Sequence, residues 1–203
     1  MPSIYDIKPA FQGLLRPLCN HMAAKGITPN QITIAALLLS IAHGAAIALF
    51  PESAWPLLLL PLTLFVRMAL NAIDGMLARE HQMQSHLGAV LNELGDVLAD
   101  AALYLPLALI PGIPAPLIVV LVLLATLTEF AGIQAVQIGA ERRYEGPFGK
   151  SDRAFLFGAT GLLLGLGLPS GLWLTLLFST ASLLALLTIF NRVRQALLTG
   201  ETS

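Results

Sequence analysis

Six long apolar stretches follow one another along this chain of 203 residues, with short polar turns between them. They occupy residues 31–50, 54–79, 85–109, 114–139, 151–168 and 171–190. A helix needs about 20 apolar residues to cross the hydrocarbon core of a bilayer. Hydrophobic residues make up 56% of the chain and charged residues only 11%, which is too apolar for a soluble domain of this length. The sequence therefore predicts an all-α integral membrane bundle of six transmembrane helices, forming a single membrane domain over residues 1–203.

The N-terminal segment differs in character from these stretches. Residues 3–25 mix apolar side chains such as Phe11 and Leu14 with the charged Lys8 and Arg16. Such a segment has too many charges to span a bilayer but suits its surface. We expect an N-terminal amphipathic interfacial helix over residues 3–25.

Basic residues are distributed unevenly between the two ends of the predicted helices. Ten of the eleven Lys and Arg fall at one surface, namely Lys8, Arg16, Lys25, Arg79, Arg142, Arg143, Lys150, Arg153, Arg192 and Arg194. The turns at the opposite surface carry a single charge, Glu52. By the positive-inside rule both termini face the cytoplasm. We expect a multi-pass protein of a bacterial inner membrane with no nucleic-acid partner.

Polar side chains gather in residues 71–100. On the first helix of this stretch, three positions share a face by helical spacing: Asn71, Asp74 and Ala78. On the second, four positions follow at four-residue steps: Gly88, Asn92, Asp96 and Asp100. Charge inside a bilayer is costly and generally functional. Two such stripes facing each other across a hairpin predict a functional site on the cytoplasmic side.

This stretch resembles the signature of the CDP-alcohol phosphotransferase (CDP-alcohol phosphatidyltransferase) family, D-x2-D-G-x2-A-R-x8-G-x3-D-x3-D. The matching positions are Asp74, Gly75, Ala78, Arg79, Gly88 and Asp96. Asn71 and Asn92 stand where the family usually has Asp. The helix start Thr28-Pro29-Asn30 and the Gly149-Lys150 segment are also similar to this family.

The resemblance implies an enzyme of phospholipid biosynthesis. Its reaction would transfer a substituted phosphate group, here phosphatidyl, from a CDP-linked alcohol such as CDP-diacylglycerol to a hydroxyl acceptor, with release of CMP. The resemblance also implies Mg²⁺ or Mn²⁺ ions held by Asn71, Asp74, Asn92 and Asp96, with Asp96 as the catalytic base. The two amides lower the formal charge of this cluster from −4 to −2, so one or two ions are both compatible with the sequence.

Other residues are assigned to substrate binding. The residues that leave room for, or contact, the cytidine nucleotide and the phosphates are Gly75, Ala78, Arg79, Gly88, Lys150 and Arg153. An Arg can make a forked contact to phosphate oxygens. For Lys150 and Arg153 the alternative is an ordinary positive anchor at the cytoplasmic surface.

Arg67 is the one basic residue far from either predicted surface. It precedes Arg79 by 12 residues, which places it about 18 Å below that helix end. An unpaired charge at this depth is expensive. We therefore expect a structural charge network in which Arg67 pairs with Asp100 or Glu129.

Two other classes of function stay open. A catalytically weak pseudoenzyme that binds nucleotide or lipid fits the two amides, and a transporter would also carry charges within the membrane. A transporter is expected to show inverted repeats and broken helices, and neither is evident in the sequence. The acceptor alcohol is not encoded in any motif, and a homodimer is compatible with the sequence.

Overall fold

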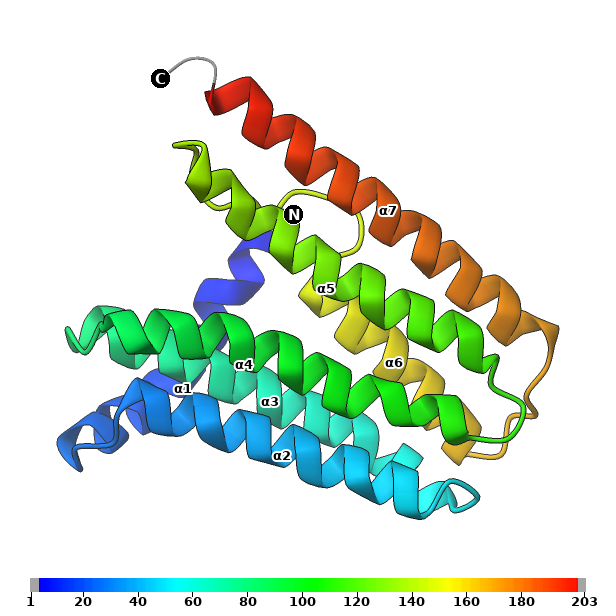
Figure 1. Cartoon of the computed structure of the whole chain (residues 1–203). Helices are drawn as coiled ribbons and strands as arrows, with labels where there is room; N and C mark the ends of the chain where they lie inside the picture. The colour runs from blue at the N-terminus through cyan, green and yellow to red at the C-terminus, as the bar shows by residue number, and fades with distance from the viewer. Residues whose placement is uncertain (1–3, 201–203) are drawn as a thin grey trace. The chain divides into compact units, whose positions relative to one another are not determined.

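The computed structural model describes residues 4–200, and these residues form helices without any β-strand. Figure 1 follows them in chain order. The helices are α1 (Ile4–Ala24), α2 (Pro29–Leu49), α3 (Ala54–Glu80), α4 (His86–Tyr104), the 3₁₀ helix η1 (Leu105–Leu109), α5 (Ala115–Gln137), α6 (Lys150–Gly165) and α7 (Leu172–Gly200). The predicted all-α class is confirmed.

The helices group into two compact units. Unit 1 contains the residues up to Ala42 together with Leu62–Ala99. Unit 2 contains His43–Pro61 together with the residues from Asp100 onwards. Helices α2, α3 and α4 contribute residues to both units.

The core of unit 1 joins helices α1, α2 and α3. Its fully buried members are Cys19, Ile32, Ile73, Met76 and Leu77. Burial raises the pKa of the Cys19 thiol, as expected for an inert core cysteine. Arg16 adds a forked ion pair, because its Nε and Nη2 donate to the two oxygens of Glu80 at 3.1 and 2.9 Å. This exposed ion pair connects α1 to the end of α3.

The start of α2 follows from local chemistry. Gly26 adopts a φ of 74°, which lets the chain leave α1 in a left-handed turn. Thr28 and Gln31 then cap α2 reciprocally, since the Thr28 amide donates to the Gln31 side chain and the Gln31 amide to Thr28 Oγ1. Pro29 is the first helical residue, where its missing N–H costs no hydrogen bond. The predicted helix start at Thr28-Pro29-Asn30 is confirmed.

The core of unit 2 is built around stacked aromatic rings. Tyr104 at the end of α4 stacks on Phe157 of α6 with ring centroids 4.0 Å apart. Phe157 in turn lies 5.9 Å from Phe178 of α7. Gly161 brings α6 close to the first turns of α3, because a Cβ there would lie 2.8 Å from a methyl carbon of Leu60.

Two helix ends differ from the sequence prediction. The third apolar stretch, expected to run to residue 109, ends as an α-helix at Tyr104 and continues as η1, because Pro106 lacks the amide hydrogen that an α-helix needs. The last helix, expected to end at residue 190, continues to Gly200. Arg192 and Arg194 end the apolar stretch but not the helix, since Arg is a good helix former.

Within residues 4–200, four helices are long and apolar enough to cross a membrane: α2, α3, α5 and α7. Helix α4 carries Glu93, Asp96 and Asp100, and α6 has only 16 residues, so the predicted spans at 85–109 and 151–168 are not confirmed. Large apolar side chains such as Phe65, Phe130 and Phe190 are more than half exposed, whereas Arg67 is 3% exposed. This inverted pattern is that of a membrane protein. Helix α1 is confirmed as a helix, and its interfacial position stays a prediction.

Gly44 sets the approach of α2 to α4 within unit 2. A Cβ at this position would lie 1.9 Å from the carbonyl oxygen of Ala102, a distance no real contact allows. We expect Gly44→Ala to lower the melting temperature of the detergent-solubilised protein, with a cost of at least about 1–3 kcal/mol. Gly13→Ala is the control, because its Cβ meets nothing within 4 Å. Equal melting temperatures for the two variants would contradict this packing.

Candidate active site

The polar stretch forms a helical hairpin within unit 1. Helix α3 ends at Glu80 and α4 begins at His86, with Ser85 capping α4 by accepting the Gly88 amide hydrogen at 3.0 Å. Gln82 in the connecting loop takes a φ of 55°, which reverses the chain direction. The two polar stripes of the sequence therefore lie on neighbouring helices, as predicted.

Asp74 is the buried carboxylate of this hairpin, with 5% exposure. The Thr33 hydroxyl of α2 lies 2.9 Å from Asp74 Oδ2 and 3.1 Å from the carbonyl oxygen of Pro29, so it donates its single hydrogen to one of the two. A charged acceptor forms the stronger bond. Thr33 orients Asp74, and sequence reasoning missed it. The available signal was a Thr one helical turn after Pro29 in an otherwise apolar run.

Asp96 is the second carboxylate, and its side chain is 23% exposed. Asn71 of α3 donates from Nδ2 to Asp96 Oδ1 at 3.3 Å, so the structure brings together two of the predicted residues. Arg67, one turn earlier on α3, donates from Nη2 to the backbone oxygen of Asp96 at 3.2 Å. The same nitrogen lies 3.9 Å from Asp96 Oδ1. Asp96 is thus held by an amide and a guanidinium from the facing helix.

The glycines of the signature make room for polar side chains. A Cβ on Gly75 would lie 2.9 Å from Arg79 Nη2, so the Arg79 guanidinium folds back over Gly75. A Cβ on Gly88 would lie 2.8 Å from Asn30 Oδ1, so the side chain of Asn30 in α2 approaches α4 at this point. The arrangement explains why these two positions tolerate no larger residue without a shift. Asn30 is a second α2 residue beside the signature.

Ala78 and Asn92 complete the signature and are half-buried. Asn92 lies one helical turn from both Gly88 and Asp96 on α4. The roles assigned to Ala78 in substrate binding and to Asn92 as a metal ligand stay predictions.

The candidate metal-ligating atoms of the hairpin are oxygens. Carboxylates and amide oxygens are the ligands that Mg²⁺ and Mn²⁺ accept, with the remaining positions filled by water or substrate phosphate. In the part of the chain that the structure describes, no three His, Cys, Asp or Glu side chains come together as a metal-ligating group. The predicted ligands of the hairpin are two carboxylates, Asp74 and Asp96, and two amides, Asn71 and Asn92.

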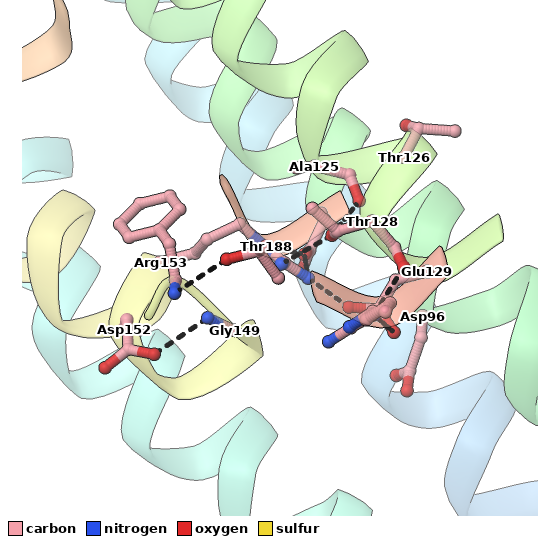
Figure 2. A network of polar contacts seen from close by, with 12 residues as sticks. Asp96, Ala125, Thr126, Thr128, Glu129, Gly149, Asp152, Arg153 and Thr188 are labelled. Carbon is pink, nitrogen blue, oxygen red and sulfur yellow. Dashed lines mark hydrogen bonds and ion pairs between the residues drawn. The ribbon is translucent and has the colours of Figure 1, made fainter. Parts of the chain in front are cut away.

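A separate charged cluster lies inside unit 2, and Figure 2 shows much of it around Glu129, Thr128 and Arg153. Arg153 of α6 is 1% exposed. Its Nη2 lies 3.0 Å from both Asp100 Oδ2 and Glu129 Oε1, and its Nη1 lies 3.3 Å from Thr128 Oγ1. One guanidinium therefore links α4, α5 and α6.

Glu129 has further cationic partners. Arg142 Nη2 lies 3.2 Å and Arg192 Nη1 3.5 Å from Glu129 Oε2. Arg192 also donates to the carbonyl oxygen of Thr128. Asp152 has a different task at the start of α6, where its Oδ2 accepts the amide hydrogen of Gly149 at 2.8 Å (Figure 2).

These contacts change the predicted location of two basic residues. Arg153 and Arg192, counted among the cationic residues of the cytoplasmic surface, are buried at 1% and 2% exposure. The cation paired with Asp100 and Glu129 is Arg153, which the sequence had assigned to substrate phosphate. The pairing of Arg67 with these acids stays a prediction, as does the contact of Lys150 with substrate. Sequence reasoning missed Thr128 and Arg142 as members of the cluster.

The fold and the hairpin define a class of protein: a helical membrane protein that carries carboxylate and amide side chains on two neighbouring helices. Within that class, the sequence matches the CDP-alcohol phosphatidyltransferase family over residues 26–187. This match covers most of the chain, and the protein belongs to this family.

Two relatives resemble the chain, one of them over nearly its whole length. It is 49% identical over 198 residues to the inner membrane protein YnbA of Escherichia coli (strain K12), a match that covers 97% of each chain. An uncharacterised protein of Aquifex aeolicus is 34% identical over 95 residues, which cover 47% of this chain.

Solved structures show the same fold. The phosphatidylinositol phosphate synthase PgsA1 of Mycobacterium tuberculosis, crystallised with CDP-DAG bound, superposes with a TM-score of 0.74 at 16% identity, covering 89% of this chain and 92% of that one. Its complex with manganese and citrate gives a TM-score of 0.73 at 19% identity, covering 89% and 87% of the two chains.

The position of Arg79 depends on Gly75. In Gly75→Ala the new methyl group would displace the Arg79 guanidinium, which is the far end of a flexible side chain. We expect a melting temperature close to wild type and a severalfold loss of affinity for CDP in a calorimetric titration, because about 1 kcal/mol suffices for that change. Unchanged CDP affinity would show that the folded-back position of Arg79 has no part in binding.

The cluster of unit 2 predicts a stability effect. Arg153→Met removes the cation shared by Asp100 and Glu129, and breaking a buried pair costs about 3–5 kcal/mol. We expect a clear drop in melting temperature in detergent. The exposed Arg194 gives the control variant Arg194→Met, which should melt like wild type. A stable Arg153→Met protein with weakened substrate binding would instead support the substrate contact predicted from the sequence.

Proposed function

We propose that this protein transfers a phosphatidyl group from a CDP-linked lipid, such as CDP-diacylglycerol, to the hydroxyl group of an alcohol acceptor and releases CMP. The observation that carries the proposal is the α3–α4 hairpin, where Asp96 and Asn71 meet at 3.3 Å within the span of the family match. A relative of the same fold has been crystallised with CDP-DAG bound, which supports a donor of this class.

We further propose a six-span topology with α1 in the interface. Helix α4 would form a span despite its acids, because Asp96 and Asp100 have cationic or amide partners from other helices. Helix α6 would cross the membrane together with the turn that follows it at Gly167, whose φ is 93°. The distribution of basic residues supports a bacterial inner membrane with the site and both termini on the cytoplasmic side. The 49% identical relative is named an inner membrane protein.

The donor diphosphate would lie at the α3–α4 hairpin. Arg79 is exposed at the end of α3 and can donate two parallel hydrogen bonds to phosphate oxygens. Gly75 makes room for the Arg79 guanidinium, and Gly88 makes room for the Asn30 side chain, which brings a polar group of α2 to the hairpin. The lipid chains of the donor would extend between helices into the bilayer.

The residues proposed to hold a divalent ion are Asp74 and Asp96, with the amide oxygens of Asn71 and Asn92 as neutral ligands. A bound Mg²⁺ or Mn²⁺ supplies neutralisation of the diphosphate charge. Thr33 fixes the orientation of Asp74 from α2. Asp74 is buried and Asp96 partly exposed, which suits a ligand role for the first and access to an acceptor for the second.

Asp96 is the proposed general base. The acceptor hydroxyl oxygen attacks the lipid-bearing phosphorus of the donor, and Asp96 accepts the hydroxyl proton. The bond between that phosphorus and the bridging oxygen breaks, and CMP leaves with the electron pair. The products are a phosphodiester lipid and CMP. The panel of acceptors in the experiment below identifies the acceptor alcohol.

The deciding experiment measures CMP release by purified protein in detergent. CDP-diacylglycerol is the donor, Mg²⁺ or Mn²⁺ is added, and a panel of polar alcohols and alcohol phosphates is supplied one at a time. Acceptor-dependent CMP release supports the proposal. No release with any acceptor, in protein shown to be folded, would sink it.

One observation favours a second candidate, a protein that binds a CDP-linked lipid without turnover. Asn71 and Asn92 stand where the family usually has Asp, so the hairpin offers two carboxylates fewer to a cation. Tight binding of CDP-diacylglycerol without CMP release would favour this candidate.

The role of Asp96 can be tested directly. Asp96→Asn retains the shape of the side chain but removes the base, so turnover should fall by about 10²-fold or more while CDP binding persists. Glu52→Gln is the control carboxylate-to-amide change, at an exposed turn residue. Near-wild-type turnover of Asp96→Asn would refute the base role. Loss of both binding and turnover would favour a purely metal-ligating role.

A further inference from the structure

Arg67 is a cation placed at the side of a candidate metal ligand. Its side chain is 4% exposed, and its Nη2 donates to the backbone oxygen of Asp96 and lies 3.9 Å from the Asp96 carboxylate. It precedes Asn71 by one helical turn, and Asn71 donates to the same carboxylate oxygen. The two α3 side chains therefore approach Asp96 from one helix face.

The positive charge of Arg67 cancels half of the negative charge at this point. Asp74 and Asp96 contribute two negative charges, Arg67 contributes one positive charge, and Asn71 and Asn92 contribute none. A dication would meet a net charge of only −1 from these five side chains, with a like charge beside one of its ligands. Repulsion between like charges is strong in a poorly hydrated site. A diphosphate ligand would add the negative charge that is lacking.

We propose that Arg67 keeps divalent-cation affinity low in the free protein and makes cation binding depend on a diphosphate ligand. In this proposal Arg67 is a positioning residue: it orients Asp96 and adds a positive charge beside it, and it does not contact the substrate. The proposal rests on the proposed function in one respect, which is that the ligand is a nucleoside diphosphate. The CDP-linked donor and the cation would then bind together, and little cation would be bound between turnovers.

The test measures Mn²⁺ binding by paramagnetic resonance or calorimetry, with no turnover required. Wild-type protein should bind Mn²⁺ weakly alone and about tenfold or more tightly with CDP, whereas cytidine, which lacks phosphate, should have no effect. Arg67→Gln should raise Mn²⁺ affinity about tenfold in the absence of CDP and reduce the gain from CDP. Arg67→Lys, which keeps the charge, should behave like wild type.

Two controls separate this role from general effects. Arg194→Gln removes a cation at an exposed position of α7 and should leave Mn²⁺ affinity unchanged. Asn71→Asp adds a negative charge at the Asp96 carboxylate with Arg67 intact, and should also raise the affinity for Mn²⁺ without CDP. This variant decides the charge argument if Arg67→Gln does not fold.

Several results would overturn the proposal. These are unchanged or weaker Mn²⁺ binding by Arg67→Gln, equal binding by wild type with and without CDP, or no gain in Asn71→Asp. A protein that releases CMP but gives any of these results contradicts the role of Arg67 alone. A protein that shows the expected Mn²⁺ pattern but never releases CMP contradicts the proposed transfer reaction alone.

Discussion

The structure depends on giving the carboxylates Asp74, Asp96, Asp100 and Glu129 a polar partner from another helix. The Asp74 carboxylate lies 2.9 Å from the Thr33 hydroxyl, and the Asp96 carboxylate accepts a hydrogen bond from Asn71 Nδ2. Arg67 donates to the backbone oxygen of Asp96 and lies 3.9 Å from its carboxylate. Asp100 and Glu129 share the Arg153 guanidinium. Desolvation of an ion without a partner costs several kcal/mol, so these contacts fix which helix faces turn inward. The contact between Asn71 and Asp96 also brings together two polar residues of the candidate site.

Close helix packing has a related cause. Without a hydrophobic driving force between helices in lipid, small residues let backbones approach and gain dispersion energy. Gly44 and Gly161 serve this purpose in unit 2, where each meets atoms of a neighbouring helix. Gly75 and Gly88 serve another purpose, because what approaches them is polar: the Arg79 guanidinium and the Asn30 amide. Glycine at helical spacing thus has two functions in one chain, and the neighbouring atoms distinguish them.

The sequence predicted the parts of the fold that depend on local patterns. Helix boundaries set by Thr28-Pro29-Asn30 and the hairpin that carries Asn71 and Asp96 followed from capping chemistry and helical periodicity. The partners of buried charges did not follow, because an ion pair between distant helices depends on tertiary packing. Arg153 was placed at a surface on the basis of its position near a helix start, yet it is fully buried between two acids. Thr33 was overlooked for the same reason.

Asn71 shows how such a site can be stable without a bound cation. A carboxylate at this position would face Asp96 Oδ1 at about the 3.3 Å now spanned by an amide hydrogen bond. Two ionised carboxylates at that separation repel each other strongly when no metal ion lies between them. The amide replaces this repulsion with a hydrogen bond, and Arg67 adds a permanent positive charge on the same side. The hairpin can therefore keep its geometry when neither donor nor cation is bound, and in our proposal the negative charge needed to hold a dication arrives with the ligand.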